Sequence, residues 1–195
     1  RSLASTGSRH RVGRSMKLPL NDCIRDLPES ASVLDVGCLG FRLIGVASGL
    51  GRGDLTHSGV DFIAEPGELP PGYEYRFADL NKDSIPYDDD SFDLVVAAHV
   101  IEHVKDPIEL IAECARVLKP GGVMYVEAPS ERSMLLPGFP FRHEEFRSLS
   151  FYDDPTHSSR PWTPQSFVRL AMYLGLEPVA AKHIISWPMR LASPV

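Results

Sequence analysis

Cysteine is scarce in this 195-residue chain. The three cysteines, Cys23, Cys38 and Cys114, form no C-x-x-C pair, and an odd number cannot complete a set of disulfides. The sequence therefore excludes a zinc knuckle and a small disulfide-stabilised domain, and it favours a reducing compartment.

Positive charge and long apolar runs are also lacking. Acidic residues outnumber Lys and Arg by 26 to 20 and are spread along the chain, which argues against a surface for nucleic acid or anionic lipid. No apolar run approaches the length of a membrane span, and the N-terminal residues lack a signal-peptide pattern. We expect a cytoplasmic protein with no nucleic-acid partner and no membrane span. The sequence is compatible with a homodimer.

What is present is an alternation of buried-strand runs and helical patterns from Ala31 onward. This alternation is typical of an α/β fold in which a mostly parallel sheet carries helices on both faces. Residues 1–30, which open on an Arg-, Ser- and Gly-rich stretch, are interpreted as a lead-in or a cover, and residues 31–195 as one domain. The expected strands are 32–37, 58–62, 74–78, 93–98, 123–128 and 178–184.

Two helices have clear start and stop signals. The first begins with Asp106 as N-cap and Pro107 at its first position, and the Pro-Gly-Gly run at 120–122 stops it. The second opens with Thr163 and Pro164 and ends at Gly175. Residues 130–163 contain a long aromatic, His- and Pro-rich stretch, which predicts a lid or acceptor-binding insertion.

Several motifs follow one another at the ends of the expected strands. The run VLDVGCLG, residues 33–40, carries a strand into a glycine turn; Asp61 ends the next strand and Asp79 the third. Taken alone, each also fits a tight turn without a ligand or a solvent-exposed loop acid. The motifs DSFDLVVAAHVIEHV and RVLKPGGVMYVEAPS come after them.

In this order and spacing, the motifs resemble the class I S-adenosylmethionine (SAM)-dependent methyltransferases, especially the branch that acts on small molecules and sugars. The resemblance covers about residues 31–185 and implies a three-layer Rossmann-like sandwich with SAM as cofactor. The turn then holds the methionine part, the acid after the second strand the ribose, and the acid after the third the adenine. The implied cofactor residues are Asp35, Gly37, Cys38, Gly40, Asp61, Phe62, Asp79, Leu80 and His99.

The glycine turn departs from the family pattern. Where the family has Gly-x-Gly-x-Gly, Leu39 and Phe41 occupy the second and third glycine positions and Gly40 falls between them. A protein that kept the fold but lost catalysis, acting as a ligand sensor or partner subunit, would show such a change. An NAD-dependent short-chain dehydrogenase and an α/β-hydrolase are disfavoured because the glycine turn with Tyr-x-x-x-Lys, and the Gly-x-Ser-x-Gly elbow, are absent.

Methyl transfer to an oxygen requires alignment and benefits from a base, for which histidine is suited near neutral pH. The candidates are His99, His103 and His157. By resemblance, His157 is preferred as the base or as the residue that orients the acceptor, although it could merely hydrogen-bond its own loop. Glu102, beside His103, is interpreted as a helix-capping residue.

No metal ion is expected, because the reaction needs none. A second interpretation remains, in which acidic and His side chains of the insertion bind a metal. Its ligands would come from His143, Glu144, Asp153, Asp154 and His157. The acceptor is expected to be a small molecule, and the resemblance favours a hydroxyl of a sugar or glycolipid.

Overall fold

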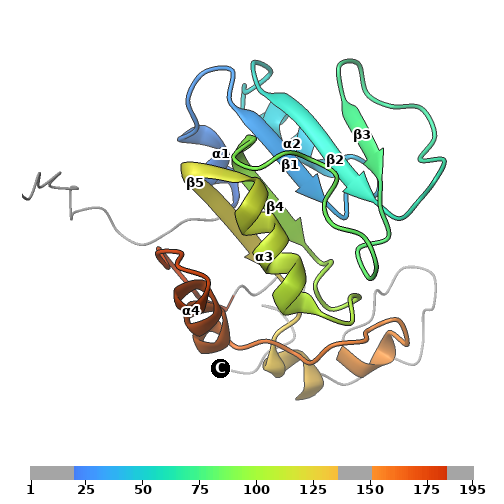
Figure 1. Cartoon of the computed structure of the whole chain (residues 1–195), viewed down its shortest axis with the longest axis vertical. Coiled ribbons are helices and arrows are strands. Elements are labelled where there is room, and N and C mark those ends of the chain that lie inside the picture. The colour runs from blue at the N-terminus through green and yellow to red at the C-terminus, as the bar shows by residue number, and fades with distance from the viewer. Residues whose placement is uncertain (1–19, 136–150, 184–195) are drawn as a thin grey trace, which may run out of the picture.

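The computed structural model describes residues 20–135 and 151–183, which form a five-stranded parallel sheet covered by helices (Figure 1). The strand order is β3-β2-β1-β4-β5. The strands are β1 Ser32–Val36, β2 Thr56–Asp61, β3 Glu74–Phe77, β4 Phe92–Ala98 and β5 Leu118–Glu127. The helices are α1 Leu20–Arg25, α2 Arg42–Gly49, α3 Pro107–Val117 and α4 Pro164–Tyr173, with short 3-10 turns η1 Glu131–Leu135 and η2 Phe151–Asp153.

The strand order places a natural binding edge at the centre of the sheet. The chain runs outward from β1 through β2 to β3 and then returns to lay β4 on the other side of β1, so that Val36 pairs with both Val60 and Ala97. The direction of the connections reverses between β1 and β4, and ligands of such sheets bind at the carboxyl ends of the strands next to this point.

Two apolar cores, one on each face of the sheet, explain the near-continuous hydrophobic strands. On one face α1 and α2 pack Ile24, Leu43 and Ala47 against the sheet. On the other face α3 contributes Ile111 and Cys114, and residues of α4 pack against the same core. The structure therefore confirms the three-layer Rossmann-like architecture.

Local signals place both predicted helix starts correctly. The Asp106 carboxylate accepts hydrogen bonds from the amides of Ile108 and Glu109 at 3.1 and 3.0 Å and so caps α3. Thr163 and Ser166 form a reciprocal capping box at the start of α4. Helix α3 ends at Val117, before the Pro-Gly-Gly run, because the next residue already adopts extended backbone and begins β5.

The connections from β2 to β3 and from β3 to β4 contain no helix, and side chains hold them in place. Arg116 of α3 donates to the backbone carbonyls of Ile85 and Tyr87 and to the carboxylates of Asp89 and Glu113. The guanidinium thereby fastens the loop before β4 onto the α3 face of the molecule.

The strand expected over 178–184 is wrong for its described part, since residues 178–183 are irregular and Val179 is exposed. Its sequence favours a strand, but a strand requires a neighbouring edge with which to pair, and these residues have none in the described structure. Residues 1–19 of the lead-in, 136–150 of the insertion and Ile184 lie outside the described residues, so that the lid and the domain limits stay predictions. Within the described ranges, no helix is both long and apolar enough to cross a membrane.

Candidate active site

The turn after β1 is built on a glycine that geometry requires. Gly37 has φ +76°, and a Cβ at this position would lie 3.0 Å from two side-chain atoms of Val100. An L side chain would therefore meet both backbone strain and crowding. The amide of Gly37 donates to the carbonyl of Val60 at 2.9 Å and so joins the turn to β2.

Asp61, the last residue of β2, lies against this turn. Its side chain is buried, and Oδ1 accepts a hydrogen bond from the amide of Phe62 at 2.7 Å. Burial raises the pKa of this carboxyl, partly offset by the amides of Phe62, Leu39 and Ile63. Asp61 thus connects the β1–α2 turn to the end of β2.

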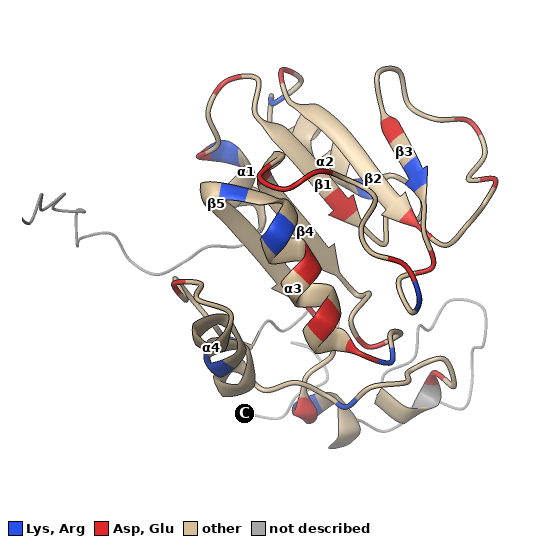
Figure 2. Cartoon of the chain, viewed as in Figure 1, with Lys and Arg blue, Asp and Glu red and all other residues tan. Residues whose placement is uncertain are grey.

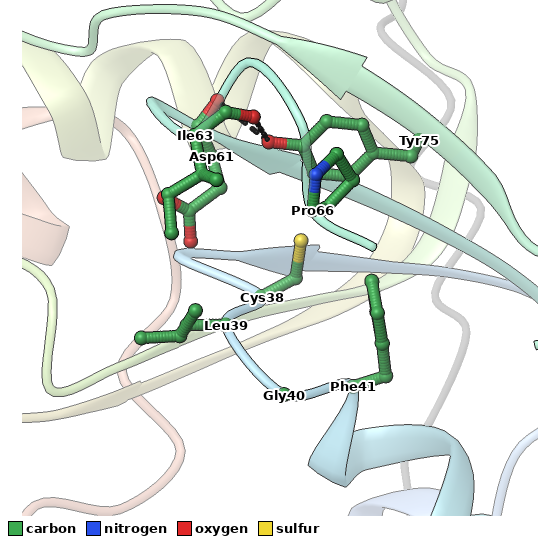
Figure 3. A pocket seen from close by; sticks show the side chains of 8 residues that line it. All are labelled: Cys38, Leu39, Gly40, Phe41, Asp61, Ile63, Pro66 and Tyr75. Atoms are coloured by element: carbon green, nitrogen blue, oxygen red, sulfur yellow. Dashed lines mark hydrogen bonds between the residues drawn. The ribbon is translucent and has the colours of Figure 1, made fainter. Parts of the chain in front are cut away.

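The hollow between the turn and the β2–β3 connection is narrow in this structure. Figure 3 shows Cys38, Leu39, Gly40 and Phe41 on one side and Asp61, Ile63, Pro66 and Tyr75 on the other. The enclosed volume is about 10 Å³, which is about the room that one water molecule needs. The hydroxyl of Tyr75 bonds to the carbonyls of Asp61 and Ile63 and so fixes the β2–β3 side of the hollow. An adenosine does not fit into this hollow without movement.

The floor of the site nevertheless favours a cationic ligand. Burial, and secondarily the neighbouring Asp61, raises the pKa of Asp35 to about 7. Two carboxyl groups with raised pKa values gain stability when a positive charge approaches them. Acidic residues indeed lie toward the carboxyl ends of β1 and β2 (Figure 2). SAM supplies such charge through its sulfonium and amino groups, so the carboxyl groups of Asp35 and Asp61 fit this cofactor.

Asp79 is not brought to the hollow. It follows β3 on the surface, where its carboxylate forms an ion pair with Lys82 at 2.6 Å and accepts from the amide of Asn81 at 3.1 Å. Leu80 is half-buried against the core below α3, and the ring of Phe62 is exposed. Asp79 is therefore not among the residues that line the hollow beside Asp61.

His99 lies directly after β4 in a strained conformation, with φ +57°. Its Nδ1 is 3.4 Å from Glu102 Oε1 and its Nε2 is 3.5 Å from Glu127 Oε1. Hydrogen bonds to Glu102 and then Glu127 raise the pKa of His99 to about 9. Such strain in a non-glycine residue persists only where its surroundings fix it, commonly at functional sites.

His103 and His157, although 54 positions apart in sequence, are neighbours, with ring centroids 4.9 Å apart. Both lie beside Glu102, so one buried carboxylate gathers the three candidate histidines at the end of β4. Glu102 is not the helix-capping residue expected from the sequence, because Asp106 caps α3. Glu102 and Glu127 were missed as site residues, although carboxylates at or near the ends of strands are the same signal that singled out Asp61.

The structure describes the side chains of only two of the five alternative metal ligands, Asp154 and His157. His143 and Glu144 lie outside the described residues, and the side chain of Asp153 is not described. Asp154 remains near His157, with Oδ2 3.9 Å from Nε2.

A family model described as a methyltransferase domain matches residues 34–126, slightly less than half of the chain. Curated relatives are named ubiquinone biosynthesis O-methyltransferase. The protein of Dinoroseobacter shibae is 29% identical over 80% of this chain and 64% of its own length. That of Actinobacillus pleuropneumoniae is 31% identical over 48% of this chain and 43% of its own length. The chain thus spans less than two thirds of either relative.

Solved structures agree on the fold. A methyltransferase of Haloferax volcanii, in complex with the activator Trm112, superposes with a TM-score of 0.61 at 20% identity and covers 80% of this chain and 66% of its own. A SAM-dependent methyltransferase of Archaeoglobus fulgidus has a TM-score of 0.55 at 24% identity and covers 74% and 60%. These comparisons show that residues 34–126 are similar to a methyltransferase domain, and that the fold is the one found in SAM-dependent methyltransferases.

Proposed function

We propose that this protein transfers the methyl group of SAM to an oxygen of a small acceptor. The observation that carries the proposal is the acidic turn at the centre of the sheet, where Asp35 and Asp61 have raised pKa values, beside a histidine cluster at the end of β4. When bound, SAM supplies an electrophilic methyl group on a positively charged sulfur. The family match and the names of the relatives support this activity.

The chain would hold the cofactor along the edge where β1, β2 and β4 end. The turn residues Asp35, Gly37, Cys38 and Gly40 would receive its methionine part, and Asp61 has lone pairs left to accept from ribose hydroxyls. The exposed rings and alkyl groups of Phe62 and Leu39 offer apolar surface for the adenine. Asp79, Leu80 and His99 complete the proposed set, Asp79 only after it leaves Lys82.

Cofactor binding requires the narrow hollow to widen. Leu39 and Phe62 already point into solvent, so the parts that must move apart are the turn and the β2–β3 loop, which Tyr75 fixes to its own strand.

His157 is suited to receive or orient the acceptor hydroxyl. Its Nδ1 lies 2.6 Å from the carbonyl of Phe151, which can only accept, so Nδ1 carries the hydrogen and Nε2 a free lone pair. A hydroxyl proton could pass to Nε2 as the oxygen bonds to the methyl carbon. The relatives act in ubiquinone biosynthesis, so the sugar or glycolipid acceptor expected from the sequence lacks support, and we propose a ring hydroxyl of a quinone precursor instead.

Calorimetric titration tests cofactor binding. We expect micromolar affinity for SAM and for its demethylated product, weakened at least tenfold in Asp61→Asn because a neutral amide leaves the cationic ligand uncompensated. Glu68→Gln, an exposed acid on the β2–β3 loop, serves as the matched control and should bind as the parent does.

Transfer itself is measured with radiolabelled SAM and pooled acceptors, hydroxylated quinone precursors in one pool and sugars in another. We expect label in the first pool, and a loss of about 100-fold in kcat for His157→Ala, the lower range for a general base. Full turnover in this variant would remove His157 from the reaction, and label in the sugar pool alone would restore the earlier expectation.

The narrow hollow and the bulky residues at the glycine positions favour a second candidate, a non-catalytic protein of the same fold that senses a ligand or supports a partner subunit. If calorimetry detects neither SAM nor its product, this second function replaces the first.

A further inference from the structure

Three side chains of the histidine cluster place atoms that could bind a metal ion close to one another. One atom each of Glu102, His103 and His157 lies within 4.8 Å of the others; we call these residues the Glu102 cluster. Two distant segments build it, the connection after β4 and the segment that follows η2, which run side by side near the start of α3 (Figure 1). The amide of Ser158 donates to the carbonyl of Glu102 at 2.8 Å and joins the two segments.

Hydrogen bonds decide which nitrogen of each imidazole faces the cluster. His157 donates through Nδ1 to the Phe151 carbonyl, which leaves the lone pair on Nε2. His103 Nδ1 lies 2.9 Å from Thr156 Oγ1, and this hydroxyl gives its single hydrogen to Asp154 Oδ1 at 2.6 Å. Thr156 can then only accept from His103, so the neutral His103 also carries its lone pair on Nε2.

Glu102 adds negative charge to these two lone pairs. Its side chain is 2% exposed, and Oε2 is buried with no hydrogen-bond partner among residues 20–135 and 151–183, while Oε1 faces His99 at 3.4 Å and His103 Nε2 at 4.0 Å. An unsatisfied buried carboxylate oxygen is costly and rare in native proteins. His99 faces Glu102 Oε1, whereas Glu102 Oε2 and the two imidazole lone pairs face no donor within the described part of the structure, so a positive ion would satisfy these three.

We propose that the Glu102 cluster is a binding site for a divalent transition metal of the Zn²⁺ class. Two imidazole nitrogens with one carboxylate oxygen suit such ions better than Mg²⁺ or Ca²⁺, which prefer oxygen. The Nδ1–H bonds to Phe151 and Thr156 are of the kind that orients metal-bound histidines. Metal–ligand bonds of about 2.1 Å place tetrahedral ligand atoms about 3.4 Å apart, so the side chains move inward on binding.

Such an ion would change the part that His157 plays. With three protein ligands, a tetrahedral ion keeps an open position, where a bound acceptor hydroxyl would lose its proton more readily. His157 would then act as a ligand of the metal ion and orient the acceptor through it, and it would not serve as the base. The site departs from the sequence expectation of no metal, and it rests on the geometry of the cluster, so that it stands even if SAM does not bind.

Cobalt titration of the whole, chelator-treated chain tests the site, because Co²⁺ bound by imidazole and carboxylate in a tetrahedral site gives visible absorption bands. We expect saturation at one equivalent, competition by Zn²⁺, and at least a tenfold loss of affinity in His157→Ala and in Glu102→Gln. His183→Ala is the matched control, since His183 also pairs with a carboxylate, that of Glu131 at 2.8 Å, but lies outside the cluster. It should bind Co²⁺ as the parent does.

Thr156→Val covers the case in which the Glu102 variant does not fold, because it touches only the partner of His103 and should weaken binding tenfold to 100-fold. Absence of Co²⁺ and Zn²⁺ binding would overturn the proposal, as would binding that survives both His157→Ala and Thr156→Val or falls equally in His183→Ala. Loss of methyl transfer on chelation supports the ion as acceptor ligand. Transfer that continues in metal-free protein limits the ion to fastening the two segments.

Discussion

At the scale of single residues, position was predictable and environment was not. Asp61 ends its strand as its sequence pattern indicated, but it is buried because the amides of the following residue and of the β1–α2 turn surround its carboxylate. Asp79 has an equally clear pattern, yet Lys82 engages it on the surface. The surroundings of the two carboxylates differ because other segments of the chain place different groups beside them. The sequence around an acid at the end of a strand does not show which groups these are.

His99 makes the stability of the protein depend on pH. Its pKa rises from 6.5 to about 9 because the folded state places it between Glu102 and Glu127. Because this pKa is raised, His99 makes its full contribution to the free energy of unfolding below pH 6.5, and this contribution is lost as the pH increases through about 9. We expect the free energy of unfolding of the parent to decrease over this range.

Urea denaturation at pH 6, 8 and 10 measures the effect, with His99→Gln as the comparison. The variant lacks the titrating imidazole, so the difference between parent and variant should shrink as the pH increases. A difference that is constant across the three pH values would contradict this account.

At the scale of elements, local signals predicted the helix starts, whereas strand limits depended on pairing. The Pro-Gly-Gly run was expected only to stop a helix, but it lies inside β5, which pairs with β4 from Phe92 onward across an irregularity before Leu94. Gly121, with φ +81°, accommodates this bulge. The neighbouring strand decided where β5 begins, and no signal within the run could show it.

The cap of α3 is the element whose loss is simplest to predict. Asp106→Ala removes the acceptor for two backbone amides and should lower the free energy of unfolding by about 1 kcal/mol. Denaturant unfolding gives the value. Lys105→Ala, an exposed neighbour whose side chain caps nothing, should change it by less than about 0.5 kcal/mol. Equal effects in both variants would show that the cap contributes nothing.

At the scale of the whole molecule, the narrow hollow predicts a local response to the cofactor. Because its volume of about 10 Å³ is far smaller than SAM, we expect binding to move the turn at 37–41 and the loop at 62–67 apart and then to order both around the ligand. We expect slower amide exchange in these two segments when SAM is present, measured by hydrogen–deuterium exchange with mass spectrometry. The N-terminal ends of the strands, far from the edge, provide the internal reference. Protection confined to other segments would place the cofactor elsewhere.

The order of strand and helix patterns by itself determined the α/β class and the parallel sheet, because hydrophobic periodicity and turn residues act over a few positions. Only the tertiary structure decided that the hollow beside Asp61 is narrow, that the 178–183 segment forms no strand, and that Glu102 lies beside both His103 and His157, which are 54 positions apart. Contacts of this kind follow from how layers pack, and packing sums many weak long-range interactions that no short stretch of sequence contains.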